Sequence, residues 1–138
     1  MKKILIVVVL SLLMVSVMAV PALAAAQKVA LMPFAGQEDP SGSGFVVWNN
    51  SSGGVDGGAE LTVSLKGAVP AADYEVFKGI PVWPWYLPIG TMTTNRQGNA
   101  NFHMVIKDMP AGTYHVRIAL NREGFTRFLT DFVAITIK

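Results

Sequence analysis

The segment with the most distinctive chemistry runs from residue 80 to residue 88 and contains Trp83, Trp85 and Tyr86. Three prolines in the same segment exclude a helix or a central strand, because proline lacks an amide hydrogen and restricts the residue before it. We therefore expect an extended loop or edge. Flat aromatic rings with a polar group can stack on sugar rings or anchor protein interfaces, so Trp83, Trp85 and Tyr86 are the candidate binding residues. The alternative is that Trp83 or Trp85 folds back and fills the open end of the domain.

Catalytic groups are few. The chain contains two histidines, His103 and His115, and both fall on the polar phase of their predicted strands. These strands should pair through the turn at residues 108–112, which would place both imidazoles on one outer face. The G-x-S-x-G nucleophile elbow is absent, and no motif selects a pair of carboxylates for glycoside hydrolysis. We therefore expect a protein that is not an enzyme, and no motif implies a cofactor.

A metal site is equally weakly indicated. The two histidines alone do not supply the four donors of a closed zinc site, although Glu60 and Glu75, which are also in polar phase, could add carboxylates. The glycine-rich stretch 53–58 is followed by no Lys-Ser/Thr pair, so it is not a phosphate-binding loop. Asp56 within it could join Glu38, Asp39 and Glu60 around a calcium ion, but the D-x-D-x-D-G spacing is missing. We predict no metal, and calcium near Asp56 stays an open alternative.

The N-terminus has the features of a cleavable export signal. In order, these are the basic residues Lys2 and Lys3, the apolar run 4–20, Pro21 and the A-x-A triplet 22–24. We assign residues 1–26 to the signal peptide, with cleavage near Ala24 or Ala26, and residues 27–138 to one domain. The alternative is a retained anchor, because the apolar run approaches the roughly 17–25 residues that cross a bilayer. Any membrane contact would then be limited to this segment.

Charge and cysteine content narrow the range of partners. The chain has 11 Lys and Arg against 9 Asp and Glu, and Lys2 and Lys3 leave with the signal. The balanced mature domain has no basic run for nucleic acid or anionic lipid. The chain has no cysteine, which excludes disulfides and thiolate sites. Because exported proteins without disulfides are commoner in prokaryotes, we expect a secreted or cell-surface protein of a prokaryote. Overlapping N-x-S sequons at Asn49 and Asn50 leave glycosylation open.

The elements that must position these residues are β-strands. Apolar and polar residues alternate over residues 61–65, 102–106, 114–120 and 133–137. This pattern is typical of strands with one face in a core and the other in water. Fuller apolar runs at 29–34 and 45–48 predict strands that are buried on both sides or lie along a seam. Turn residues separate the runs, and no window has the period of an amphipathic helix.

One short motif occurs twice. Residues 70–76 and 110–116 share P-A-x-x-Y-x-V, and we interpret both as hairpins entered through a proline turn. In each copy a tyrosine, Tyr74 or Tyr114, follows the proline by four residues, from where its phenol can reach back to the turn backbone. The arrangement resembles the tyrosine corner of immunoglobulin-like and fibronectin type III-like sandwiches. Ala68 stands where fibronectin-type modules usually have leucine, and the immunoglobulin cysteine pair is missing.

A second motif covers residues 89–102. Its G-T-hydrophobic-T-T-N-x-x-G-N pattern predicts a strand, a tight turn over residues 95–98 and a returning strand. It resembles a hairpin of exported immunoglobulin-like domains of unassigned function. We interpret it as scaffold, with a ligand loop as the alternative.

These observations predict an all-β protein, namely a single antiparallel immunoglobulin-like β-sandwich of about seven to eight strands preceded by an N-terminal signal helix. The expected function is that of an exported, non-catalytic binding or structural module at the cell surface. One alternative is a carbohydrate-binding module that uses Trp83, Trp85 and Tyr86. The other is a self-assembling surface or filament subunit whose N-terminal strand, about residues 28–34, adds to the edge of a neighbour. The expected partners are a polysaccharide, another cell-surface protein or a second copy of the chain.

Overall fold

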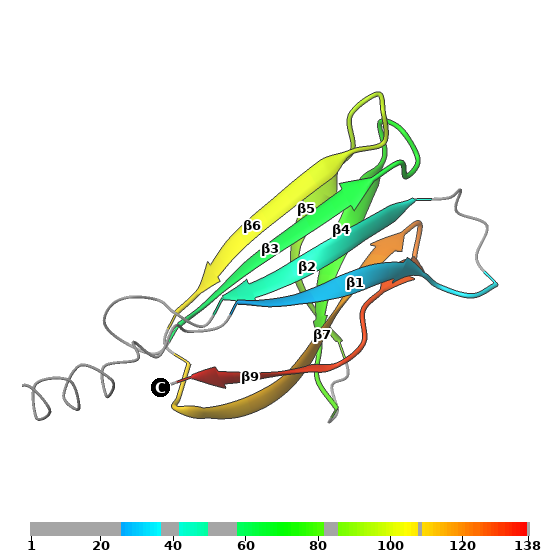
Figure 1. Ribbon diagram of the computed structural model, residues 1–138. Helices are drawn as coiled ribbons and strands as arrows, with labels where there is room; N and C mark the ends of the chain where they lie inside the picture. Colours follow the sequence, from blue (N-terminus) through cyan, green and yellow to red (C-terminus); the bar gives the residue numbers. More distant parts are fainter. Residues whose placement is uncertain (1–25, 37–41, 50–57, 82–85, 108, 138) are drawn as a thin grey trace, which may run out of the picture.

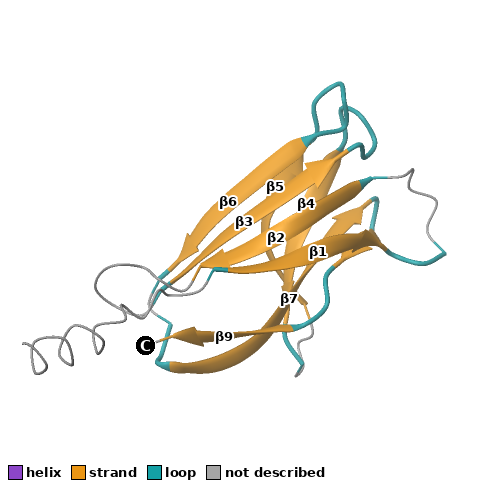
Figure 2. Cartoon of the chain, in the orientation of Figure 1, coloured by secondary structure: helices purple, strands orange, loops and turns teal. Residues whose placement is uncertain are grey.

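The computed structural model describes residues 26–36, 42–49, 58–81, 86–107 and 109–137, and every regular element within them is a β-strand (Figures 1 and 2). The strands are β1 (Gln27–Pro33), β2 (Ser43–Asn49), β3 (Ala59–Lys66), β4 (Asp73–Gly79), β5 (Tyr86–Thr93), β6 (Ala100–Ile106), β7 (Gly112–Arg122), β8 (Phe125–Leu129) and β9 (Val133–Ile137). The predicted all-β class is confirmed. The predicted signal helix falls in residues 1–25, outside the described residues. Within the described part, no helix is long and apolar enough to cross a membrane.

The strands form one antiparallel sheet in the order β5-β4-β7-β8-β1-β2-β3-β6, with β9 paired to β7. The sheet folds over, so that β1, β2, β3 and β6 face the half formed by β4, β5, β7 and β8 (Figure 1). The halves join at β1, which pairs first with β2 and then, through Met32 and Pro33, with Leu129 and Phe128 of β8. The predicted seam at residues 29–34 is therefore confirmed. Because hydrogen bonding continues around this join, the fold is compatible with a sandwich but is nearly barrel-shaped.

Strand β7 is the longest and carries two partners in succession. Its second half pairs with β8, where Ala119 lies opposite Leu129, and its first half pairs with β9, where Val116 lies opposite Val133. Between these ladders the Thr130 amide donates to the Ile118 carbonyl at 3.0 Å, and the Ile118 amide donates to Thr130 Oγ1 at 3.0 Å. The chain after Thr130 is thereby held against β7 before β9 begins.

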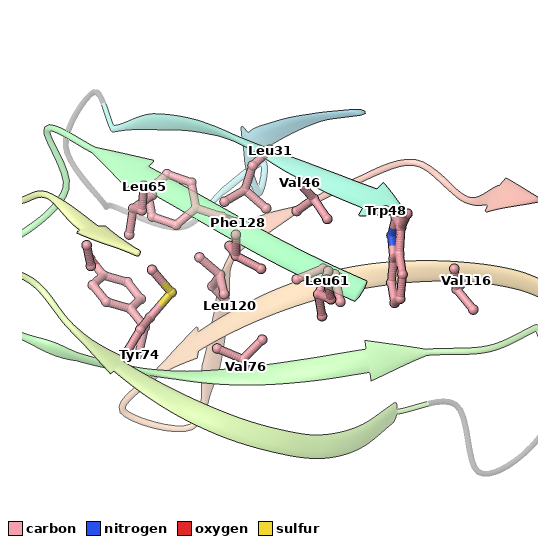
Figure 3. Close-up of a cluster of buried hydrophobic side chains, with 14 of the residues drawn as sticks. Leu31, Val46, Trp48, Leu61, Leu65, Tyr74, Val76, Val116, Leu120 and Phe128 are labelled. Carbon is pink, nitrogen blue, oxygen red and sulfur yellow. The ribbon is translucent and has the colours of Figure 1, made fainter. Parts of the chain in front are cut away.

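The core is filled by the apolar phase of the strands. Leu61, Val63 and Leu65 of β3 are fully buried, as are Ile118 and Leu120 of β7. Figure 3 shows Leu61 and Leu65 of one half of the sheet and Leu120 of the other in the same cluster as Phe128 and Tyr74. Removing a leucine-sized side chain from water is worth about 1.5–3 kcal/mol, so this alternation supplies the main driving force for the fold.

The predicted hairpins are wrong, although the strands and turns that form them are present. β3 pairs with β2 and β6, whereas β4 pairs with β5 and β7, so the first proline turn carries the chain from one half of the sheet to the other. In the same way, β5 and β6 share no ladder across residues 94–99, and β6 and β7 share none across 107–111. A turn motif determines where the chain bends, but the burial of both apolar faces decides whether the next strand returns or crosses.

The first two crossing turns, residues 67–72 and 94–99, bind each other through backbone groups. The Ala68 amide donates to the Gly98 carbonyl at 3.0 Å, and the Ala71 amide donates to the Asn95 carbonyl at 3.1 Å. Thr94 Oγ1 donates to the Val69 carbonyl at 2.6 Å. The polar residues of the second motif therefore bond to backbone of these two turns, which supports its interpretation as scaffold.

Both repeated tyrosines reach the backbone of the turn before them, as predicted. The Tyr74 phenol accepts a hydrogen bond from the Val69 amide at 3.3 Å, and the Tyr114 phenol donates to the Pro110 carbonyl at 2.8 Å. The two sites differ in depth, because Tyr74 is fully buried whereas Tyr114 is only half-buried. The shared motif thus gives the same local bond with different burial.

Candidate binding surface

Tyr86, Gly79 and Arg117 lie side by side across β5, β4 and β7. Gly79 pairs with Tyr86 on one side and with Arg117 on the other. A Cβ atom at Gly79 would lie 2.9 Å from Tyr86 Cε1 and 3.0 Å from Arg117 Cγ. The two side chains therefore fill the space above Gly79, and any side chain at this position would collide with them.

The Arg117 guanidinium contacts aromatic rings on both sides of its strand. Its Cζ lies 5.3 Å from the centroid of the Tyr86 ring and 4.4 Å from the centroid of the Phe132 ring. We call Tyr86, Arg117 and Phe132 the aromatic–arginine cluster. Phe132 is 41% exposed, and the other two residues are half-buried. Cation–π contacts of this kind stabilise by about 0.5–2 kcal/mol each, so the cluster is an ordered surface feature.

Of the three predicted binding residues, the structure places one. Tyr86 begins β5 and joins the cluster, whereas Trp83 and Trp85 lie outside the described residues. Arg117 and Phe132 were not predicted from the sequence. Arg117 lies in the polar phase of β7, and only the strand register brings it beside a tyrosine 31 positions earlier in the chain.

The two histidines do not form a shared site. His103 Nε2 lies 2.6 Å from Glu60 Oε1, and both side chains are about half exposed. His115 lies on β7 opposite Ala134 of β9. The expectation that their strands pair is wrong, because β6 pairs with β3 and the chain then crosses to the other half of the sheet. The two imidazoles therefore lie on strands that share no ladder in the described part of the chain.

The part of the chain that the structure describes contains no cluster of three or more His, Cys, Asp or Glu residues that could hold a metal ion. Glu60 pairs with His103, and the other calcium candidates, Glu38, Asp39 and Asp56, lie outside the described residues.

We expect substitution of either histidine by alanine to change the free energy of unfolding by no more than about 0.5 kcal/mol. Both side chains are exposed, and a surface ion pair such as His103–Glu60 stabilises by little. Urea unfolding of His103→Ala and His115→Ala measures this. A loss of several kcal/mol at either position would contradict the assignment of both imidazoles to the surface.

An open groove occurs at another place, between the turn after β3 and the turn between β7 and β8. Asp73 on its wall already accepts a hydrogen bond from Thr93 Oγ1 at 2.6 Å. Arg122, also on its wall, lies over the buried Tyr74 ring at 5.8 Å from the centroid. The described residues that line the groove include no aromatic side chain, so the aromatic–arginine cluster is the better candidate for a binding surface.

Comparison of the chain with models of protein families, with curated proteins and with solved structures gives no match. The resemblance to immunoglobulin-like and fibronectin type III-like modules therefore has no support from a related protein. What stands is the antiparallel all-β class and the geometry of the cluster, and the function must be argued from these.

Proposed function

We propose that this protein is an exported, non-catalytic module that binds polysaccharide through the aromatic–arginine cluster. The observation that carries the proposal is the Arg117 guanidinium held between the rings of Tyr86 and Phe132 on the outer face of the sheet. Phe132 is 41% exposed although it is a large apolar side chain. An ordered aromatic surface beside a hydrogen-bond donor suits the apolar face and the hydroxyl groups of a sugar ring.

The neighbouring sequence supports the same surface. Trp85 directly precedes Tyr86, and Trp83 lies two positions further back, in the segment that joins β4 to β5. The N-terminal export signal implies that the mature domain meets extracellular or cell-surface material, where polysaccharide is abundant. Tyr86 connects the residues predicted from the sequence to the cluster found in the structure.

We expect Phe132→Ala to lower the affinity for a bound polysaccharide on the order of tenfold, because it removes one ring of the cluster. Affinity electrophoresis through gels that contain a panel of neutral and acidic polysaccharides measures this as lost retardation. Tyr86→Ala and the double variant Trp83→Ala/Trp85→Ala should act in the same direction. Each variant should remain folded. Phe132→Ala and Tyr86→Ala each lose one cation–π contact and should melt somewhat below the wild type, whereas the tryptophan double variant should melt close to it.

Phe125 offers a matched control for Phe132. It is 57% exposed and also has an arginine over its ring, Arg127 at 5.7 Å, but it lies at the start of β8, away from the cluster. Phe125→Ala should leave the retardation unchanged. Equal losses in Phe125→Ala and Phe132→Ala, or retardation by no polysaccharide at all, would overturn the proposal.

Self-assembly is the second candidate, and one observation favours it. In the described part of the chain, β5, β6 and β9 each pair on one side only, and such edges can accept a strand from another copy. The predicted donor strand, β1, pairs with β2 and β8 of its own chain and would have to leave them. A monomer in light scattering at high protein concentration would argue against assembly.

A further inference from the structure

Among the described residues Arg117 has no carboxylate partner, in contrast to Arg122 and Arg127, which lie in the same half of the sheet. Arg127 Nη2 lies 3.5 Å from Glu123 Oε2, and Arg122 Nε lies 4.0 Å from the same oxygen. Arg117 makes no hydrogen bond or ion pair with any described residue, and its contacts are the two rings of the cluster. The terminal N–H groups of the guanidinium, unlike the buried Nε, are therefore left for an external group.

The Arg117 side chain is half-buried and restricted by its neighbours. Its Nε is fully buried and has no hydrogen-bond partner among the described residues, and a buried donor left unpaired is unfavourable. The rings of Tyr86 and Phe132 restrict the side chain, so little conformational freedom is left to lose when a ligand binds. A preorganised guanidinium with free donors is well suited to an oxyanion.

We infer that the sugar units bound by the cluster bear carboxylate groups, as in a polyuronate. The planar guanidinium matches a carboxylate with two parallel N–H···O bonds, and such charge-assisted bonds are stronger than those to hydroxyl groups. The exposed ring of Phe132 would contact the sugar ring while Arg117 donates to its carboxylate. This inference rests on the proposed polysaccharide binding and names the chemical class of the ligand.

General electrostatic attraction does not explain such selectivity. Without Lys2 and Lys3 the chain has as many acidic as basic side chains, so it has no net positive charge to draw in polyanions. Recognition of an acidic polysaccharide must then depend on an individual cation, and Arg117 lies between the two rings of the cluster.

The test uses the full mature protein in affinity gels with polygalacturonate, alginate and hyaluronate. Methyl-esterified polygalacturonate keeps the sugar rings but lacks the charge, and dextran sulfate supplies a different anion. We expect strong retardation by at least one polyuronate and weak retardation by the ester and by dextran sulfate. Arg117→Gln should lower the affinity for that polyuronate on the order of tenfold or more, and Arg117→Lys should recover part of the loss.

Arg96 supplies the charge-matched control, because it is exposed in the turn at the far end of β5. Arg96→Gln should bind as the wild type does. Melting curves show whether each variant is folded, and competition by free glucuronate against glucose tests the wild type without any substitution. Glucuronate should release the protein from the gel at concentrations at which glucose does not.

The possible failures are distinguishable. In one failure, neutral polysaccharides or the ester retard the protein as strongly as polyuronate does, and Arg117→Gln does not change this retardation. That result would overturn the carboxylate inference and leave polysaccharide binding intact. Preference for dextran sulfate over every polyuronate would also overturn it. Retardation by no polysaccharide, neutral or acidic, would overturn the proposed function itself.

Discussion

Replacing Gly98 by alanine is expected to destabilise the protein by about 4 kcal/mol or more, an exceptional loss for the addition of one methyl group. Gly98 has a φ of +76°, a left-handed conformation that disfavours any side chain. The added Cβ would lie 2.0 Å from the Ala68 carbonyl oxygen and 2.8 Å from its amide nitrogen. Both contacts are with backbone, which the Ala68 to Gly98 hydrogen bond holds in place, so the methyl group cannot be accommodated without separating the two turns.

Gly67 provides the control for Gly98. It also has a left-handed φ, +64°, and lies in the facing turn, but a Cβ there would meet nothing within 4 Å. Gly67→Ala should therefore cost only about 1 kcal/mol, the price of the backbone conformation alone. Urea unfolding of both variants, analysed with a common slope, gives their free energies of unfolding. The difference between these free energies is the contribution of the clash. Equal losses would mean that the two turns do not pack as the structure shows.

The positions of strands and turns could be predicted from this sequence more fully than the pairing of the strands. The alternation over residues 61–65 and 114–120 identified strands and the side that each one buries, because a period of two follows directly from strand geometry. The partners depend on contacts between residues far apart in the chain. The turn residues of 67–72 and 94–99 are compatible with a hairpin or a crossing, and packing between these two turns selects the crossing.

Strand β8 was not predicted, and the reason is a local irregularity. Its register against β7 shifts between Leu120 and Asn121, so residues 125–129 do not alternate. Arg127 is 9% exposed although it is charged, and the apolar Phe125 is 57% exposed. A bulge moves side chains to the unexpected face and removes the periodic signal.

The candidate binding surface was predictable only in part, because its residues are far apart in the sequence. Tyr86 was found because it lies beside Trp83 and Trp85 in a segment of unusual composition. Arg117 comes from β7, whose register against β4 places it beside Gly79, and Phe132 comes from the segment between β8 and β9. Neither has a distinctive neighbour in the sequence. The binding roles of Trp83 and Trp85 remain predictions from composition, and the variants proposed above test them.

Tyr74→Ala is the second substitution from which we expect a large effect, a loss of about 4 kcal/mol in the free energy of unfolding. The ring is fully buried and lies 6.0 Å from the Phe128 ring between centroids, so its removal leaves a cavity between the two halves of the sheet (Figure 3). Tyr74→Phe keeps the ring and removes the acceptor of the Val69 amide. That variant should lose only about 1 kcal/mol, the usual contribution of one hydrogen bond.

Tyr114 separates the contribution of burial from that of the turn bond, because it makes a comparable bond at a half-exposed position. Tyr114→Phe should lose less than Tyr74→Phe, since water can satisfy the exposed Pro110 carbonyl once the phenol is gone. Tyr114→Ala should likewise cost less than half as much as Tyr74→Ala, because a partly exposed ring leaves a smaller cavity. The free energy of unfolding of all four variants is measured by urea unfolding, followed by tryptophan fluorescence. The signal comes from the buried Trp48, with a background from Trp83 and Trp85. If the two alanine variants lost equal stability, the repeated motif rather than the core position of Tyr74 would be the source of the stabilisation.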